Sequence, residues 1–313
     1  MKAVIVEHRG DRGSLCEVPT PVPASHDVLI RVTAAGINPM DWKIRERGDR
    51  PMPFVLGQDF AGVVSATGDR VTKYREGERV FGIAREHGAY AEYTLVPEDD
   101  RTQPIAKIPD DVGDADAAAL PTAGLTALAS IDVLRLGQGT TLLVLGATGG
   151  VGSFAVQMAR DRGARVAGTA RAVNEQFAKS LGVDEFVAYD RGDVVEAVRA
   201  LYPDGVDAVL DVVDDSDEIK RMADVVRAEG RLVSTIRAAD VDWFAQRNIA
   251  ATNIAMAQTP QSSHAGLRTL LGMFEQGRLR VVIAGERPLA EAAEALEQSK
   301  SGSVDGKLVL TVA

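Results

Sequence analysis

The chain has 313 residues, 45% of them apolar, which is the size and composition of about two ordinary globular domains. Its formal net charge of −10 comes from 45 acidic and 35 basic residues without a dense basic run, which argues against nucleic-acid binding. The single cysteine, Cys16, excludes an internal disulfide and any multi-cysteine zinc site. No stretch approaches the ~20 apolar residues of a membrane helix, and the N-terminus becomes charged too early for a signal peptide. We expect a cytoplasmic protein with no membrane or nucleic-acid partner.

Short apolar segments separated by glycine and proline clusters fill the first hundred residues. They predict strands at 2–7, 27–35, 60–66, 79–83 and 90–96. Strands this short, joined by turns, are typical of a barrel-like or sandwich-like β module. The pattern becomes helical from Ala115, so we expect this module to end near residue 120.

Beyond residue 140 the chain alternates strands and helices. Strands are predicted at 141–146, 165–169, 185–188, 206–212 and 230–236, and helices at 152–162, 174–181, 193–201 and 217–227. This alternation predicts an α/β fold with a doubly wound parallel sheet, to which 249–255 would add a sixth strand. Helices at 264–276 and 289–299 and strands at 281–284 and 306–312 would follow. We assign residues 1–120 and 260–313 to a substrate domain and 121–259 to a nucleotide-binding domain.

A glycine-rich turn follows the first of these strands and opens the next helix. In such a turn, backbone N–H groups at the helix N-terminus face a pyrophosphate, and glycines stand where a Cβ would block it. The predicted cofactor-binding residues of this turn are Gly146, Ala147, Thr148, Gly149, Gly150, Val151 and Gly152.

The end of the second strand discriminates between the two nicotinamide dinucleotides. An NAD site usually has Asp or Glu here to bind the ribose 2′-hydroxyl, but Ala170 and Arg171 stand at this point and no acid comes before Glu175. Arg171 could bind a 2′-phosphate, with help from Asn174, or it could be a solvated loop arginine. We expect NADPH to be preferred over NADH.

Motifs along nearly the whole chain resemble the medium-chain dehydrogenase/reductase superfamily, in its zinc-free quinone oxidoreductase (zeta-crystallin-like) branch. They begin at Ala35 (AGINPMDWK), Leu56 (LGQDFAGVV), Gly88 (GAYAEY), Pro121 (PTAGLTA) and Gly306 (GKLVL), together with the glycine turn. The resemblance implies a GroES-like β-barrel-type catalytic domain and a Rossmann domain with a six-stranded sheet. It also implies a homodimer in which edge strands pair, for which 249–255 is the candidate segment.

No metal site is expected. Zinc-dependent relatives carry a cysteine and a His-Glu pair where this chain has Asn38 and Gln58-Asp59. Catalytic zinc needs thiolate or imidazole ligands, which one distant cysteine and four scattered histidines cannot supply.

Without zinc, an alcohol substrate is disfavoured and a quinone or conjugated carbonyl compound fits better, since it accepts hydride directly and leaves charge on an oxygen. The matched motifs offer Asn38, Lys43 and Thr126 as catalytic residues. The resemblance implies that Asn38 and Thr126 face the nicotinamide or the substrate. Asn38-Pro39 could equally form a turn, and Lys43 could be a solvated lysine.

Further cofactor contacts follow from the resemblance and from the carboxyl edge of the sheet, where open α/β folds bind ligands. These residues are Tyr189, Val213, Ser234, Thr235, Ile236, Ala255 and Lys307.

The sequence thus predicts an NADPH-dependent, zinc-independent reductase of quinones or α,β-unsaturated carbonyl compounds. Two alternatives stay open. One is an enoyl reductase acting on a thioester-bound biosynthetic intermediate, and the other is a non-catalytic NADPH-binding redox sensor or partner-binding protein.

Overall fold

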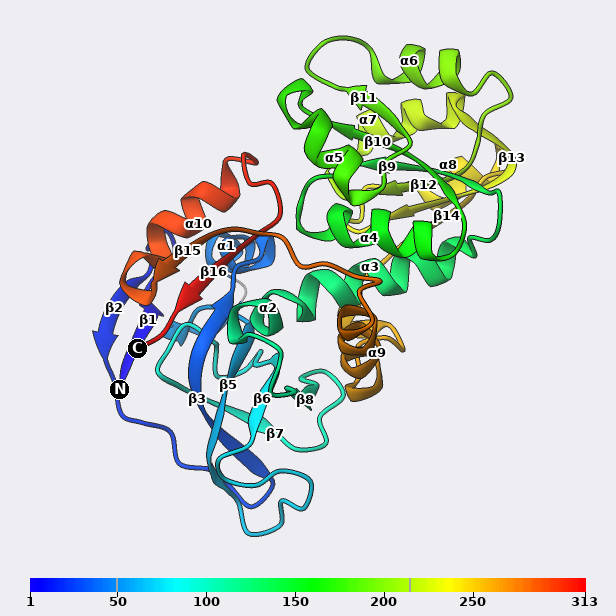
Figure 1. Cartoon of the computed structure of the whole chain (residues 1–313). Helices are drawn as coiled ribbons and strands as arrows, with labels where there is room; N and C mark the ends of the chain where they lie inside the picture. The colour runs from blue at the N-terminus through cyan, green and yellow to red at the C-terminus, as the bar shows by residue number, and fades with distance from the viewer. Residues whose placement is uncertain (49, 214) are drawn as a thin grey trace. The chain divides into compact units, whose positions relative to one another are not determined.

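The computed structural model describes residues 1–48, 50–213 and 215–313, and the chain divides into two compact units (Figure 1). Unit 1 comprises Met1–Ala123, Ser262–Glu275 and Val281–Ala313. Unit 2 comprises Gly124–Gln261 and Gln276–Arg280. The boundaries expected from the sequence lay at residues 120 and 260, and residues 276–280 were expected in the substrate domain.

Unit 1 is built mainly from strands. A seven-stranded sheet has the order β15-β16-β3-β5-β6-β8, with β7 also paired to β3, and a three-stranded sheet has the order β2-β1-β4. The strands are β1 (Lys2–Val6), β2 (Ser14–Glu17), β3 (Asp27–Gly36), β4 (Phe54–Val55), β5 (Asp59–Thr67), β6 (Arg79–Ile83), β7 (Tyr93–Pro97), β8 (Ile105–Lys107), β15 (Ile283–Pro288) and β16 (Lys307–Thr311).

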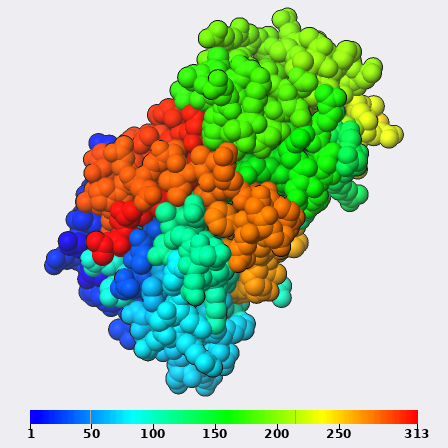
Figure 2. Space-filling model, viewed as in Figure 1, coloured from blue at the N-terminus to red at the C-terminus, as the bar shows by residue number. Residues whose placement is uncertain are grey.

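Strand β3 lies at the centre of this unit because it pairs with β5, β7 and β16. Its residues Val28, Ile30 and Val32 are buried in the core, while Arg31 between them is exposed, as the two-residue period of a strand requires. The C-terminal strand β16 also lies here, so the expected return of the tail to the first domain is found. Figure 2 shows the C-terminal segment in orange and red beside the blue N-terminal residues.

Among the described residues, four α-helices lie wholly within unit 1, and α3 (Pro121–Leu134) begins in it and ends in unit 2. The four are α1 (Pro39–Arg47), α2 (Asp114–Ala119), α9 (His264–Glu275) and α10 (Ala292–Lys300). Helix α10 contributes Ala292, Ala295 and Leu296 to the core of the unit.

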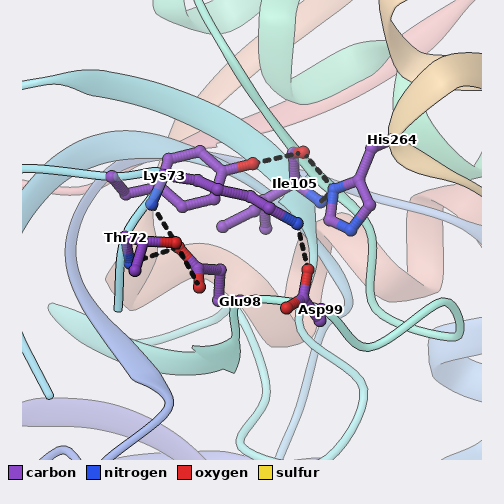
Figure 3. Close-up of polar contacts among 7 residues, drawn as sticks. Thr72, Lys73, Glu98, Asp99, Ile105 and His264 are labelled. Atoms are coloured by element: carbon purple, nitrogen blue, oxygen red, sulfur yellow. Dashed lines mark hydrogen bonds and ion pairs between the residues drawn. The ribbon is translucent and has the colours of Figure 1, made fainter. Parts of the chain in front are cut away.

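A polar network holds the start of α9 against β8 (Figure 3). The His264 ring nitrogen Nδ1 lies 2.7 Å from the Ile105 carbonyl oxygen, and the Tyr74 hydroxyl donates to the same oxygen at 2.9 Å. Nearby, the Glu98 carboxylate accepts from the Thr72 backbone N–H at 2.8 Å. His264, one of the four histidines, therefore has a structural contact in unit 1.

Unit 2 contains a six-stranded parallel sheet with the order β11-β10-β9-β12-β13-β14. Its strands are β9 (Thr141–Leu145), β10 (Arg165–Ala170), β11 (Glu185–Ala188), β12 (Val206–Asp211), β13 (Val226–Ser234) and β14 (Ala250–Asn253). Successive strands are added on one side of β9 and then, from β12 on, on its other side. Open α/β sheets bind ligands where the strand order reverses in this way, at the carboxyl ends of the strands.

Helices cover both faces of this sheet (Figure 1). Side chains of α6, α7 and α8 pack against Leu143, Val209 and Leu232 on one face, and α4 contacts β9 and β10. The helices are α4 (Gly150–Asp161), α5 (Glu175–Leu181), α6 (Val194–Leu201), α7 (Ser216–Arg221) and α8 (Val241–Ala245).

The helix expected at 217–227 was too long. Helix α7 ends at Arg221, and a 3₁₀ turn, Met222–Asp224, follows it. Strand β13 then begins at Val226 rather than at 230, because tertiary pairing overrides the local pattern: the Val206 N–H donates to the Val225 carbonyl oxygen at 2.8 Å. Within the described part of the chain, no helix is long and apolar enough to cross a membrane.

Candidate functional site

The glycine turn of unit 2 requires glycine at two of its positions. Gly146 has a φ of +85°, and a Cβ there would lie 2.7 Å from the Val213 side chain. A Cβ on Gly152 would lie 2.1 Å from the Gly146 carbonyl oxygen. Gly149 is the N-cap of α4 and has no side chain to satisfy the first N–H groups of this 12-residue helix. Those N–H groups can therefore bind an anionic pyrophosphate.

The end of β10 holds this turn in place. The Thr169 hydroxyl oxygen accepts from the Gly146 N–H at 3.0 Å, and the Thr169 carbonyl oxygen accepts from the Ala147 N–H at 2.9 Å. Thr169 is buried, and it was not predicted as a site residue. A hydroxyl side chain near the end of a mostly apolar strand was the signal available in the sequence.

Asp211, at the end of β12, organises the neighbouring strand ends. It is fully buried and pairs with Leu145 in the sheet, so it lies beside the start of the glycine turn. Its carboxylate accepts from the Ser234 hydroxyl at 2.7 Å and from the Val213 N–H at 3.0 Å, and its carbonyl oxygen accepts from the Thr235 N–H at 3.0 Å. Asp211 thus brings three predicted cofactor residues together, and it was missed by the sequence analysis.

Two other predicted cofactor residues follow in unit 2. Ile236 packs against the hydrophobic core formed with α6, α7 and α8. Ala255 lies just after β14 and precedes a 3₁₀ turn. Ile254, between β14 and Ala255, donates its N–H to the Ser234 carbonyl oxygen at 2.9 Å, so this segment adjoins the residues that Asp211 organises.

The predicted ribose-binding residues follow the adjacent strands β10 and β11. Ala170 is buried at the end of β10, and its carbonyl oxygen accepts from the Tyr189 N–H at 3.2 Å. Tyr189 is 49% exposed, which leaves its ring accessible to a ligand. Asp190 also lies here and accepts from the Ala172 N–H at 2.8 Å, next to Arg171. The structure therefore groups Arg171 with Tyr189, and adds a carboxylate that the sequence analysis did not weigh.

Unit 1 contains a group of buried polar side chains near the end of β3. The Lys307 ammonium donates to Asn38 Oδ1 at 2.5 Å and to the Ile37 carbonyl oxygen at 2.8 Å. Asn38 Nδ2 donates to Asp59 Oδ2 at 2.9 Å. Asn38 and Lys307 are each 3% exposed, and Asp59 is fully buried. We call five residues the buried polar cluster: Asn38, Asp41, Asp59, Tyr90 and Lys307.

Asp59 has partners for both carboxylate oxygens. In addition to the Asn38 amide, it accepts from the Thr122 hydroxyl at 2.5 Å and from the Thr122 N–H at 3.0 Å. Burial raises the pKa of Asp59, and the Lys307 charge opposes this rise. Burial also lowers the pKa of Lys307, against the charges of Asp59 and Asp41. The ammonium and the carboxylate thus stabilise each other's charged forms.

Asp41 is the second carboxyl group of the cluster and caps α1. Its Oδ2 atom accepts from the Asn38 N–H at 2.8 Å and from the Tyr90 hydroxyl at 2.8 Å. The Asp41 side chain thus closes a capping box at the start of α1. Burial raises its pKa to about 7, and the hydrogen bonds from Asn38 and Tyr90 offset only part of the effect. Tyr90 gave no sequence signal of this contact, which spans 49 positions.

Comparison with known proteins assigns the chain to a family. Residues 24–110 match the family model of the alcohol dehydrogenase GroES-like domain, and residues 181–310 match that of a zinc-binding dehydrogenase. The chloroplast envelope quinone oxidoreductase homolog of Arabidopsis thaliana is 30% identical, over 94% of this chain and 92% of that protein. The chain belongs to the quinone oxidoreductase branch of the medium-chain dehydrogenase/reductase superfamily. The family predicted from the sequence motifs is confirmed.

Two further relatives extend this result. The 2-methylene-furan-3-one reductase of Solanum lycopersicum is 31% identical over 94% of this chain and 74% of that protein. The structure of Escherichia coli quinone oxidoreductase in complex with NADPH superimposes with a TM-score of 0.90 at 25% identity, covering 99% of this chain and 100% of that chain. The predicted fold class, a GroES-like domain with a six-stranded Rossmann sheet, is confirmed, and the protein is an oxidoreductase.

Because one matched family model is named for zinc, we tested whether the buried polar cluster suits that metal. Catalytic zinc in this superfamily would need thiolate or imidazole donors, whereas the cluster offers an amide, two carboxyl groups and a phenol. Its fifth member, the Lys307 ammonium, already occupies Asn38 Oδ1 with a positive charge. Over the described residues, no three His, Cys, Asp or Glu side chains are grouped to hold a metal ion. This donor set does not fit catalytic zinc.

The other two predicted catalytic residues lie outside the cluster. Lys43 is on α1, and its ammonium lies 5.4 Å from the centroid of the Trp42 ring. Burial lowers the pKa of Lys43, and the charge of Arg47 adds to the effect. Thr126 is buried in the part of α3 that belongs to unit 2, where its carbonyl oxygen accepts from the Ser130 hydroxyl at 2.7 Å.

Proposed function

We propose that this oxidoreductase transfers a hydride from NADPH to a quinone or an α,β-unsaturated carbonyl compound without zinc. The observation that carries the proposal is the Asn38 carboxamide, held between Lys307 and Asp59 where zinc-dependent relatives have a metal ligand. A neutral N–H donor can stabilise negative charge on a carbonyl oxygen, so a carbonyl conjugated to the hydride acceptor suits it.

In this proposal, unit 2 binds the cofactor mainly through its backbone. The N–H groups of the glycine turn hold the pyrophosphate, and Thr169 keeps Gly146 and Ala147 in position. Asp211 keeps Val213 and Ser234 in place at the carboxyl edge of the sheet. NADPH, when bound, supplies the hydride.

The preference for NADPH rests on Arg171. Its guanidinium can form a charge-assisted hydrogen-bonded pair with a 2′-phosphate, which NADH lacks. The Asp190 carboxylate nearby accepts from the Ala172 N–H at 2.8 Å. Arg171 therefore supplies the positive charge at this edge of the sheet in our proposal.

For the acceptor, we propose that an Asn38 N–H donates to the oxygen that gains charge. Asn38 is neutral and its amide orientation is set by its neighbours, so it needs no reorganisation during the reaction. Water supplies the proton that completes the reduction. Lys43 stays a candidate donor to the acceptor, with its ammonium 5.4 Å from the centroid of the Trp42 ring.

The names of two relatives support the substrate class. The Arabidopsis relative is called a quinone oxidoreductase homolog. The Solanum lycopersicum relative is called a 2-methylene-furan-3-one reductase, and the compound in that name is an enone. The Escherichia coli structure contains NADPH, which supports the same cofactor here.

The test is oxidation of NADPH by the purified protein with a panel of quinones, enals and enones, before and after treatment with a zinc chelator. We expect turnover that survives chelation and is faster with NADPH than with NADH. Tight NADPH binding without turnover of any acceptor would favour the non-catalytic sensor. Turnover restricted to thioester-bound enoyl compounds would favour the enoyl reductase.

We also propose a cytoplasmic homodimer, with the lone Cys16 compatible with a reducing compartment. Strand β14 forms one edge of the six-stranded sheet and could pair with the same strand of a second copy. Light scattering coupled to size-exclusion chromatography measures this directly: twice the 33.2 kDa chain mass is expected, and a single chain mass would refute the dimer.

A further inference from the structure

The Asn38 carboxamide is hydrogen-bonded to the Lys307 ammonium at its oxygen and to the Asp59 carboxylate at its nitrogen. Strand β3 pairs with β5 on one side and with β16 on the other, so Gly36 lies opposite both Asp59 and Val309. Asn38 follows β3 by two residues, and Lys307 stands at the start of β16. The sheet register therefore places an ammonium and a carboxylate on either side of this side chain.

These two charges determine which way the amide points. The Lys307 ammonium has only donors, so it must face the amide oxygen, and the Asp59 carboxylate accepts from the amide nitrogen. A flipped amide would set donor against donor at Lys307 and acceptor against acceptor at Asp59. These two hydrogen bonds hold the amide orientation more strongly than two neutral hydrogen bonds would, because both partners of Asn38 are charged and buried.

A count of hydrogen atoms shows what remains for a ligand. Asn38 Nδ2 carries two hydrogens, and one of them goes to Asp59. The amide oxygen is an acceptor and faces Lys307, so the N–H donor that Asn38 can offer to a substrate oxygen is its second one. Lys307 itself is 3% exposed and gives two of its three N–H groups to Ile37 and Asn38.

We propose that Lys307 is a positioning residue, which together with Asp59 holds the Asn38 carboxamide so that its second N–H donates to the carbonyl oxygen of the acceptor. This inference rests on the proposed function, and it deepens it by giving Lys307 a role toward the acceptor rather than toward the cofactor. Lys307 acts through Asn38 and touches neither substrate nor cofactor.

The test combines kinetics with a double-mutant cycle. In Lys307→Met, kcat is expected to fall on the order of 10- to 100-fold, with the Kd for NADPH unchanged, because one oriented donor is lost. In an Asn38→Ala background, adding Lys307→Met should change kcat by no more than about twofold, since the residue that Lys307 positions is already absent. Lys300→Met, which removes an exposed lysine paired with Glu46, serves as the matched control and should keep wild-type kinetics.

A second variant covers the case in which Lys307→Met does not fold. That substitution leaves the buried Asp59 charge without its counter-charge, whereas Lys307→Met combined with Asp59→Asn removes both charges together. The double variant is expected to show the same loss of kcat. Its folding is checked by thermal unfolding and near-ultraviolet circular dichroism.

Nuclear magnetic resonance of the Asn38 side-chain amide tests the proposal without an activity assay. In the wild type, the Asn38 side-chain NH₂ signal in the ¹⁵N spectrum, assigned by its loss in Asn38→Ala, should be shifted and protected from hydrogen exchange. Both properties should disappear in Lys307→Met with Asp59→Asn.

Three results would overturn the proposal: an unchanged kcat, additive effects of the Asn38 and Lys307 substitutions, or an unaltered Asn38 amide signal. A loss of NADPH affinity with normal kcat at saturation would instead make Lys307 a cofactor contact. If the wild type reduces no acceptor, the proposed function fails, while the amide signal still decides whether Lys307 positions Asn38.

Discussion

The glycine turn of unit 2 and the buried polar cluster of unit 1 position functional groups by different means. In the turn, Gly146 donates to Thr169, 23 positions away, and the backbone N–H groups at the start of α4 have no side-chain cap. In the cluster, Lys307 donates to Asn38 across 269 positions, and buried charged side chains fix one amide. The turn thus depends on the absence of side chains, and the cluster depends on a balance of buried charges. Substitutions in the turn should therefore change NADPH affinity, and substitutions in the cluster should change kcat or the pH dependence of stability.

The largest effect is expected at Asp41, because burial raises its pKa from 3.8 to about 7. The unfolded chain loses this proton near pH 4 and the folded protein near pH 7, so the free energy of unfolding falls as pH rises between these values. The difference of roughly three pKa units corresponds to about 4 kcal/mol. Asp41→Asn should lack the Asp41 contribution to this fall, whereas Asp69→Asn, at an exposed position, should keep it. Denaturant unfolding at a series of pH values measures both, and identical pH profiles for wild type and Asp41→Asn would contradict the account.

The next effect tests the glycine turn. Gly152→Ala places a Cβ 2.1 Å from the Gly146 carbonyl oxygen, so the turn must shift and NADPH affinity should fall about 100-fold. Gly137→Ala is the control, since a Cβ there meets nothing within 4 Å. Fluorescence titration with NADPH measures the Kd values. Wild-type affinity in Gly152→Ala would show that the turn does not hold the cofactor.

Arg171 tests the selection of the cofactor. Arg171→Ala should weaken NADPH binding about tenfold and leave NADH binding unchanged, because only NADPH carries the 2′-phosphate. Arg171→Lys, which keeps the charge but not the two-pronged geometry, should fall between the two. Competition titrations with both cofactors measure the ratio. An equal loss for NADPH and NADH would remove Arg171 from the phosphate site.

The smallest effect is expected at Thr169. Thr169→Val removes the oxygen that accepts from the Gly146 N–H, a loss of about 1 kcal/mol, or roughly fivefold in NADPH affinity. Thr169→Ser keeps the hydroxyl and should bind as the wild type does. The same fluorescence titration compares them, and equal affinities for the Val and Ser variants would mean that the hydroxyl does not support the turn.

The contrast between the two regions also explains what the sequence could predict. The glycine turn is a contiguous motif between a strand and a helix, so its place in the fold was predictable, as was the six-stranded sheet. The motifs of unit 1 indicated Asn38 and Lys307 separately. Their contact depends on the pairing of β16 with β3, which no local pattern encodes.

The same limit applies to Asp211 and to strand β13. Asp211 is one of two acids in β12, and its importance becomes visible only when Ser234 and Val213 are seen to donate to it. The early start of β13 at Val226 depends on pairing with Val206, 20 residues earlier in the chain. Both are contacts between separate elements, for which the sequence of either element alone carries no signal.

The central claim is that Asn38 acts on the acceptor while unit 2 holds the cofactor, and the kinetics of Asn38→Ala test it most directly. With a quinone or enone that the wild type reduces, we expect kcat to fall about 100-fold while the Kd for NADPH stays the same. An unchanged kcat, or a loss explained entirely by weaker NADPH binding, would contradict the account.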